Sequence, residues 1–264
     1  MLIVAERINA SRKAIRAALE QMDAAAIQAE ATAQAQAGAH YIDLNGGTFP
    51  GREPELLCWL VDAVQQVTDR PLCLDSSDPA ALAAALPRVK QTTPMLNSIT
   101  LERDRFERVL PLVREFRGKV VALCQGEGMA TTAQQKIDTA CRLIDRLSGA
   151  GIVLADIYVD SLVFPVATDS ASGRAALEAI GEIMRRYPGV HTICGLTNVS
   201  HGLPARKLIN RTFLVCAIAA GLDAGILDPT DRELMAALLA AEAVLGRDDY
   251  CLGLLKAFRA GKLS

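Results

Sequence analysis

The sequence predicts an α/β fold, a single (β/α)₈ barrel formed by all 264 residues. Three observations favour this fold. Eight short, almost wholly apolar runs alternate with eight longer amphipathic runs, as expected for parallel strands that are buried on both faces. The length is close to the ~250 residues of one such barrel. No linker or low-complexity tract interrupts the chain, so we expect one domain over residues 1–264.

The predicted elements follow in strict alternation, because each parallel strand needs a crossover to reach the next. The strands are expected at 2–6, 41–45, 72–76, 95–99, 120–125, 157–162, 192–197 and 224–227. The helices are expected at 24–37, 53–67, 79–86, 103–117, 132–147, 173–187, 206–220 and 231–245. Gly38 ends the first helix, and Asp78 before Pro79 is typical of a helix start. An open doubly wound sheet is the alternative, disfavoured because the first strand–helix turn lacks G-x-G-x-x-G.

Composition and charge exclude several classes of partner. The chain is 51% hydrophobic and 22% charged, which is typical of a globular protein. Its net charge of −2 provides no broad basic field, so we expect no nucleic-acid partner. The apolar stretch 214–222 is far shorter than the ~18–20 residues of a membrane helix, so we expect no membrane partner. Glu6 and Arg7 interrupt the apolar start too early for a signal peptide, which predicts a cytoplasmic protein.

The seven cysteines are dispersed and form no Cys-x-x-Cys motif, which predicts reduced core thiols rather than a disulfide framework. Cys73, Cys124 and Cys194 fall on three predicted strands, so a zinc–thiolate site is an alternative. Core packing is favoured, because free cysteine behaves as a small hydrophobic residue. We therefore expect no metal site.

Polar residues end every predicted strand, and in a barrel these ends converge on the face where active sites lie. The polar endings are 6–9, 43–47, 75–77, 97–98, 125–128, 160–161, 195–200 and 228–229. Helix capping is the alternative role for such residues, and it suits Asp78 and Asp228 better than Asp75 and Asp160. The latter two directly follow apolar triplets, several residues before the next helix.

The residue types at these ends indicate the kind of ligand. Asp43, Asp75 and Asp160 offer acceptors, and the amides of Asn45, Asn97 and Asn198 both donate and accept. A carboxylate can accept two parallel N–H bonds, so this set suits a flat heterocycle with a guanidine-like edge. The charged run 103–108 predicts a solvated helix face, with partner docking as the alternative.

Several segments resemble the pterin-binding barrel superfamily, and within it the methyltetrahydrofolate:corrinoid protein methyltransferases. The folate-binding module of cobalamin-dependent methionine synthase is similar. The segments are 6–9 (ERIN), 38–47 (GAHYIDLNGG), 72–76 (LCLDS), 96–98 (LNS), 158–160 (YVD) and 195–200 (GLTNVS), supported by 203–206 and 208–213. The resemblance runs from residue 1 to about 255.

The resemblance implies a role for each site residue. Asp75, Asn97 and Asp160 would hold the polar edge of the pterin, and the pterin-binding set would also include Asp43, Asn45 and Gly195. Asn198 would lie near N5, the nitrogen that carries the methyl group, and would be the catalytic residue. Arg206 and His201 would lie where the folate and the corrinoid approach. The family more often has an amide where His201 stands and a proline where Ser161 stands.

The implied reaction transfers a methyl group between methyltetrahydrofolate and a cobalamin. A tertiary amine is a poor leaving group, so N5 must gain a proton before or during the transfer, from water or a nearby carboxylate. None of His40, His191 and His201 lies in the Asp-x-His-x-x-Gly motif of corrinoid modules. We therefore expect the cobalamin on a separate corrinoid protein that binds transiently, and the resemblance implies a homodimer.

Two other functions remain open. Dihydropteroate synthases share the fold and the pterin site, but they normally carry Ser-Arg-Lys after strand 7 and Arg-x-His on the last strand. Here the corresponding segments are 197–199 (TNV) and 226–228 (ILD). A non-catalytic folate-binding scaffold would keep Asp75, Asn97 and Asp160 but would not need Asn198.

Overall fold

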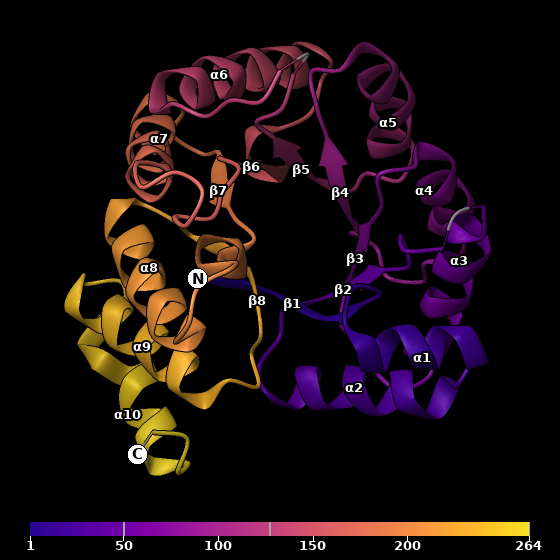
Figure 1. Ribbon diagram of the computed structural model, residues 1–264, viewed down its shortest axis with the longest axis horizontal. Coiled ribbons are helices and arrows are strands. Elements are labelled where there is room, and N and C mark those ends of the chain that lie inside the picture. Colours follow the sequence, from indigo (N-terminus) through magenta and orange to yellow (C-terminus); the bar gives the residue numbers. More distant parts are fainter. Residues whose placement is uncertain (50, 127, 264) are drawn as a thin grey trace.

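The computed structural model describes residues 1–49, 51–126 and 128–263. Its eight strands are all parallel and follow the order β7-β6-β5-β4-β3-β2-β1-β8. Their bounds are β1 (Leu2–Asn9), β2 (Tyr41–Asn45), β3 (Leu72–Asp75), β4 (Met95–Ile99), β5 (Lys119–Leu123), β6 (Ile157–Asp160), β7 (His191–Ile193) and β8 (Ala224–Leu227). A parallel bridge between Gly195 and Ile226 joins the two ends of the sheet. The predicted barrel fold is confirmed, and its strands form the central ring in Figure 1.

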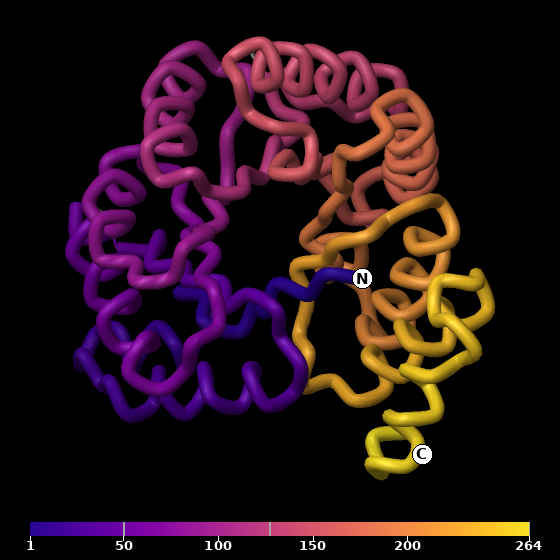
Figure 2. Tube along the Cα trace, turned by 180° about the vertical axis from the view of Figure 1, so that it is seen from behind, coloured from indigo at the N-terminus to yellow at the C-terminus, as the bar shows by residue number. Residues whose placement is uncertain are grey.

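Helices surround this ring, and the tube in Figure 2 shows the first strand entering beside the orange segments near the other end of the chain. The helices are α1 (Lys13–Gln21), α2 (Ala24–Gln36), α3 (Glu53–Val64), α4 (Pro79–Ala85), α5 (Arg103–Glu115), α6 (Ala133–Gly149), α7 (Ser172–Arg186), α8 (Arg206–Ala220), α9 (Arg232–Val244) and α10 (Leu252–Arg259). Asp23, Asp78 and Asp231 cap α2, α4 and α9 by accepting backbone N–H bonds. Thr132 and Gln135 form a capping box at the start of α6.

The structure corrects several predicted boundaries. The expected strand at 192–197 ends at Ile193, and a 3₁₀ turn, Leu196–Ser200, replaces its second half. Helices α1 and α10 were not predicted, although Ile15, Ala18 and Leu19 give α1 a buried face with helical spacing. Glu127, in the predicted polar ending 125–128, lies outside the described residues.

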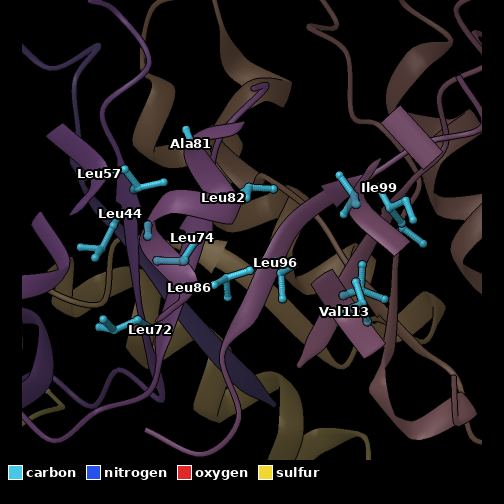
Figure 3. Packing of buried hydrophobic residues seen from close by; sticks show 14 of the residues in the cluster. Leu44, Leu57, Leu72, Leu74, Ala81, Leu82, Leu86, Leu96, Ile99 and Val113 are labelled. Atoms are coloured by element: carbon cyan, nitrogen blue, oxygen red, sulfur yellow. The ribbon is translucent and has the colours of Figure 1, made fainter. Parts of the chain in front are cut away.

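Most of the core lies between the strands and the helices. Figure 3 shows Leu44, Leu74 and Leu96 of the strands packed with Leu57 and Leu82 of α3 and α4. A smaller cluster takes one residue from each strand and fills the lumen: Val4, Tyr41, Cys73, Met95, Val121, Tyr158, Ile193 and Ala224. These mostly apolar side chains close the lumen from below, and they form an apolar floor beneath the carboxyl ends of the strands.

The prediction of core thiols is only partly correct. Cys73, Cys124 and Cys194 are buried, but Cys216 is exposed on α8. Burial raises the pKa of all three buried thiols, because their thiolates would lie in apolar surroundings. Such thiols are inert packing groups. Among the described residues, no helix has both the length and the apolar character to cross a membrane.

Candidate functional site

The side chains above the apolar floor form the base of the candidate site. Strand side chains alternate between faces, so the residue two positions beyond each lumen residue also faces the lumen. These residues are Glu6, Asp43, Asp75, Asn97, Leu123, Asp160, Gly195 and Ile226. Four of the eight carry a carboxyl group. These eight residues form the acidic layer, which lies above the apolar floor. It lies toward the carboxyl ends of the strands, where barrel active sites lie.

Asp43 and Asp75 lie on adjacent strands and influence each other. Asp43 is 1% exposed, and burial beside the negative Asp75 raises its pKa well above the ordinary value. Burial also raises the pKa of Asp75 to about 6, although Asn45 and Arg105 act in the opposite direction. The Asn45 side chain donates a hydrogen bond to Asp75 Oδ2 at 2.8 Å, and its Oδ1 accepts from the Gly47 N–H at 3.0 Å. Asn45 therefore fixes the orientation of Asp75.

A cavity of about 410 Å³ opens above β3, β4 and β5, lined by Asp75, Asn97, Leu123, Gln125 and Arg105, among others. Arg105 is buried, and its guanidinium donates to the backbone carbonyls of Ser76 and Ser77. The prediction of a fully solvated face over 103–108 is therefore wrong at Arg105. Its positive charge lies close enough to Asp75 to lower the pKa of that carboxyl. The cavity thus offers an anchored carboxylate, an amide and an apolar wall to a flat polar ligand.

Asp160 supplies a further acceptor at the end of β6. It is 8% exposed, its Oδ1 accepts from the Leu162 N–H at 2.7 Å, and burial raises its pKa to about 6. The positive charge of Lys136, on α6, opposes this rise. Lys136 is fully buried, and its Nζ donates to the Ala130 carbonyl at 2.8 Å and the Leu162 carbonyl at 2.7 Å. One buried cation thus links the loops after β5 and β6 beside Asp160.

The 3₁₀ turn after β7 carries Asn198, which is exposed. A Cβ on Gly195 would lie 3.0 Å from the Asn198 Nδ2, so glycine allows the amide to approach the backbone closely. Arg206 donates from Nε to Ser200 Oγ at 3.1 Å and from Nη2 to the Thr197 carbonyl at 3.0 Å. These bonds hold the turn on both sides of Asn198. Arg206 therefore positions the turn, a role that adds to the predicted one.

A second and larger cavity, about 730 Å³, lies above β1, β8 and the start of α8. Its lining includes Glu6, Asn198, His201 and Arg206. Glu6 accepts a hydrogen bond from Thr197 Oγ1 at 3.4 Å, and burial near Asp228 raises its pKa to about 7. The barrel mouth therefore has two compartments, one beside Asp75 and Asn97 and the other beside Asn198 and Glu6.

The structure brings the predicted residues together in these two groups. The first group lies on or beside the acidic layer and contains Asp43, Asn45, Asp75, Asn97 and Asp160. The second group lies on the β7–α8 connection and at the start of α8, and it contains Gly195, Asn198, His201 and Arg206. The sequence analysis included Glu6 in the polar ending 6–9 but gave it no role, and it did not identify Arg105 or Lys136 as site residues. The two-residue spacing from Val4 could have identified Glu6, whereas no local pattern distinguishes Lys136 from a surface lysine.

Comparison with known proteins agrees with this geometry. A family model described as pterin binding enzyme matches residues 5–228. The methylcorrinoid:tetrahydrofolate methyltransferase of Eubacterium limosum is 36% identical over 269 residues, covering 100% of this chain and 98% of that protein. The methionine synthase of Mycobacterium tuberculosis is 34% identical over 241 residues, which cover 86% of this chain but 20% of the synthase.

Solved structures show the same fold. A dihydropteroate synthase of Coxiella burnetii in complex with pteroic acid has a TM-score of 0.71 and 17% identity, covering 94% of this chain and 93% of that one. A dihydropteroate synthase of Xanthomonas albilineans with 7,8-dihydropteroate has a TM-score of 0.68 and 19% identity, covering 93% and 92%. The chain therefore belongs to the family of pterin-binding enzymes, and within it to the family of the Eubacterium limosum methyltransferase.

Proposed function

We propose that this protein is a methyltransferase that moves the N5-methyl group between methyltetrahydrofolate and the cobalt of a cobalamin carried by a separate corrinoid protein. The observation that carries the proposal is the acidic layer of the lumen, in which Asp75, Asn97 and Asp160 sit above an apolar floor. The full-length relationship to a methylcorrinoid:tetrahydrofolate methyltransferase supports the same reaction.

The carboxylates and the amide suit the pterin edge. A pterin presents ring N–H and amino groups side by side, and ionised Asp75 and Asp160 can accept these donors as charge-assisted bonds. Because burial has already raised both pKa values, a bound N–H edge would stabilise the ionised carboxylates and release protons. Binding therefore replaces an unfavourable buried charge with a paired one.

Asn198 lies on the other side of the mouth, where we place N5 of the bound folate. Its amide can accept a hydrogen bond from protonated N5 and can donate to the unprotonated nitrogen. The protein then has two tasks, to orient the folate and to favour the protonated amine that leaves when the methyl group is transferred. The strongly nucleophilic cobalt(I) of the partner supplies the remaining chemistry.

The corrinoid protein would bind over the carboxyl ends of the strands. Asn198, His201 and Arg206 are exposed there, so a large partner could reach the methyl group without displacing the barrel. His201 would face the corrinoid. We also propose a homodimer, which sedimentation equilibrium of the purified protein tests directly.

Calorimetric titration with methyltetrahydrofolate tests the pterin site. Asp75→Asn should weaken binding by about 10- to 100-fold, because a charged acceptor of the pterin N–H groups is lost. Asp78→Asn is the matched control, since Asp78 caps α4 and asparagine caps equally well. Equal affinity of Asp75→Asn and the wild-type protein would reject the proposed pterin position.

A further inference from the structure

The environment of Glu6 is unusual for a carboxyl group within a strand. Glu6 lies two residues after Val4 of the lumen floor, so its side chain faces the lumen. The register of β1 against β2 shifts between Ala5 and Ile8, so an irregularity of the strand lies at Glu6 and Arg7. Arg7 pairs with Glu30 and Asp228, whereas the Glu6 side chain reaches Thr197 in the 3₁₀ turn after β7. Both side chains line the second cavity, but within the described part of the chain only Arg7 is held in ion pairs there.

The charged groups around Glu6 come from three connections. Asp228 follows β8, Arg12 precedes α1, and Arg206 begins α8, while Thr197 donates the hydrogen bond from the 3₁₀ turn. Asp228 favours the protonated form of Glu6 through like-charge repulsion, and the two arginines with Thr197 oppose it. The other titratable or charged groups that line the same cavity are Arg7, His201, Lys207 and Asp231.

Glu6 and Asp228 have opposite environments although they lie close together. Asp228 accepts from Arg7 at 2.9 Å and from Thr230 Oγ1 at 2.6 Å, and these partners lower its pKa. Glu6 accepts one long bond, from a hydroxyl, among the residues that the structure describes, and burial raises its pKa to about 7. Two neighbouring carboxyls whose environments separate their titration are typical of an acid–base pair in an active site. Of the two, Glu6 is the group that can carry a proton at neutral pH.

Thr197 and Asn198 are consecutive, so Glu6 borders the residue that the proposed function places at N5. Glu6, Asn198, Arg206 and His201 line one cavity of about 730 Å³, large enough to admit the reacting part of the folate. We propose that Glu6 holds the proton that is exchanged with N5 of the folate during methyl transfer. This inference rests on the proposed function.

In the proposed reaction, a proton transfer between Glu6 and N5 accompanies the transfer of the methyl group. Toward the corrinoid, the O–H bond of Glu6 breaks and an N5–H bond forms. The N5–methyl bond breaks with its electron pair left on nitrogen, and cobalt(I) provides the pair for the new cobalt–carbon bond, becoming cobalt(III). The Glu6 carboxylate then regains a proton from water. In the opposite direction, the carboxylate accepts the N5 proton as tetrahydrofolate takes up the methyl group.

Single-turnover rates over a range of pH test the proposal, with methyltetrahydrofolate and free cob(I)alamin as the probes. The wild-type rate toward cobalamin should fall as the pH rises through about 7, where Glu6 loses its proton, and the reverse rate should rise. Glu6→Gln should lower the rate by about 100-fold or more. It should also remove the change of rate near pH 7 in both directions of transfer. Its dissociation constant for methyltetrahydrofolate, measured by calorimetry, should change less than about threefold.

Two further variants test which neighbours of Glu6 set the pH at which the rate changes. Asp228→Asn removes a negative neighbour and should move the change of rate to lower pH. Thr197→Val removes the hydroxyl donor and should move it to higher pH. Glu178→Gln is the matched control, because Glu178 pairs with Arg174 on the exposed face of α7, and it should leave the pH dependence unchanged.

The outcomes separate this inference from the proposed function. A wild-type protein that binds and transfers the methyl group, with Glu6→Gln equally fast and equally pH-dependent, would reject the role of Glu6 alone. Loss of methyltetrahydrofolate binding in Glu6→Gln would assign Glu6 to binding and overturn the proton role. A wild-type protein that transfers the methyl group neither to free cob(I)alamin nor to a corrinoid protein would reject the proposed function itself.

Discussion

Burial places the carboxyl groups of the acidic layer in an environment that disfavours their charged form. Asp43 is almost fully buried, and its Oδ1 has no hydrogen-bond partner among the residues that the structure describes. An unpaired buried acceptor costs about 1–3 kcal/mol, and this cost is retained in the folded protein. Groups held in this way are typical of binding sites, because a ligand that supplies donors recovers the lost free energy.

Asn198→Ala tests the residue placed at N5. The transfer rate should fall by orders of magnitude while the affinity for methyltetrahydrofolate falls less, because the amide acts mainly when N5 is protonated. By analogy with deleted oxyanion donors, the loss should be about 2–4 kcal/mol of activation free energy. Single-turnover kinetics and calorimetry measure the two quantities. Gln134→Ala is a control, since the Gln134 side chain donates to Asp138 on the exposed face of α6. An unchanged rate in Asn198→Ala would remove its catalytic role.

Asp160→Asn tests the cost of the buried carboxylate. Since the folded protein raises the pKa of Asp160 from 3.8 to about 6, ionisation opposes folding, and stability falls as the pH rises through this window. The variant should therefore gain up to about 3 kcal/mol in free energy of unfolding at about pH 8, and less at about pH 4. Urea unfolding of the free protein measures this gain, with Asp169→Asn as the control. A variant that is less stable at the higher pH would contradict the assignment.

At the scale of elements, the sequence predicted the strands and most helices, because their apolar runs and capping residues are local signals. It placed Asp75 and Asp160 correctly at the ends of β3 and β6 for the same reason. Asp43 and Asn97 lie instead in the middle of β2 and β4. It extended the strand that ends at Ile193 too far, since Leu196 and Val199 are buried in a 3₁₀ turn and resemble strand residues. Arg105 and Lys136 could not be identified, because their burial depends on loops that only the fold brings over them.

Lys136→Met tests how the loops after β5 and β6 are joined. The carbonyls of Ala130 and Leu162 would each lose a donor, at a cost of about 1–3 kcal/mol in free energy of unfolding per group. Removal of the positive charge should also raise the pKa of Asp160, which NMR titration of ¹³C-labelled aspartate measures. Lys207→Met, on the exposed start of α8, serves as the comparison. An Asp160 titration identical in both variants would show that Lys136 does not act on the site.

For the whole molecule, two clusters have separate tasks. The cluster between strands and helices stabilises the barrel, and the cluster in the lumen supports the acidic layer from below. The bridge from Gly195 to Ile226 closes the ring beside the turn that carries Asn198. The barrel thereby holds Asp75 and Asn97 at a fixed separation from Asn198, as the proposed reaction between two bound substrates requires.

Leu74→Ala tests the stabilising cluster. Leu74 is fully buried among strand and helix side chains, so the variant should lose about 2–5 kcal/mol in free energy of unfolding. Leu252→Ala removes the same atoms at a residue that is 62% exposed, and its change should stay within about 0.5 kcal/mol. Chemical denaturation compares the two. Equal losses would show that burial does not determine stability at these positions.

The most direct measurement of the central claim is anaerobic mixing of the protein with methyltetrahydrofolate and free cob(I)alamin, followed by the Co(I) absorbance. The proposed function predicts rapid, enzyme-dependent formation of methylcobalamin that Asn198→Ala slows by orders of magnitude. Tight folate binding without any transfer, to free cobalamin or to a corrinoid protein, would instead indicate a folate-binding scaffold. Neither binding nor transfer would contradict the assignment of a folate methyltransferase.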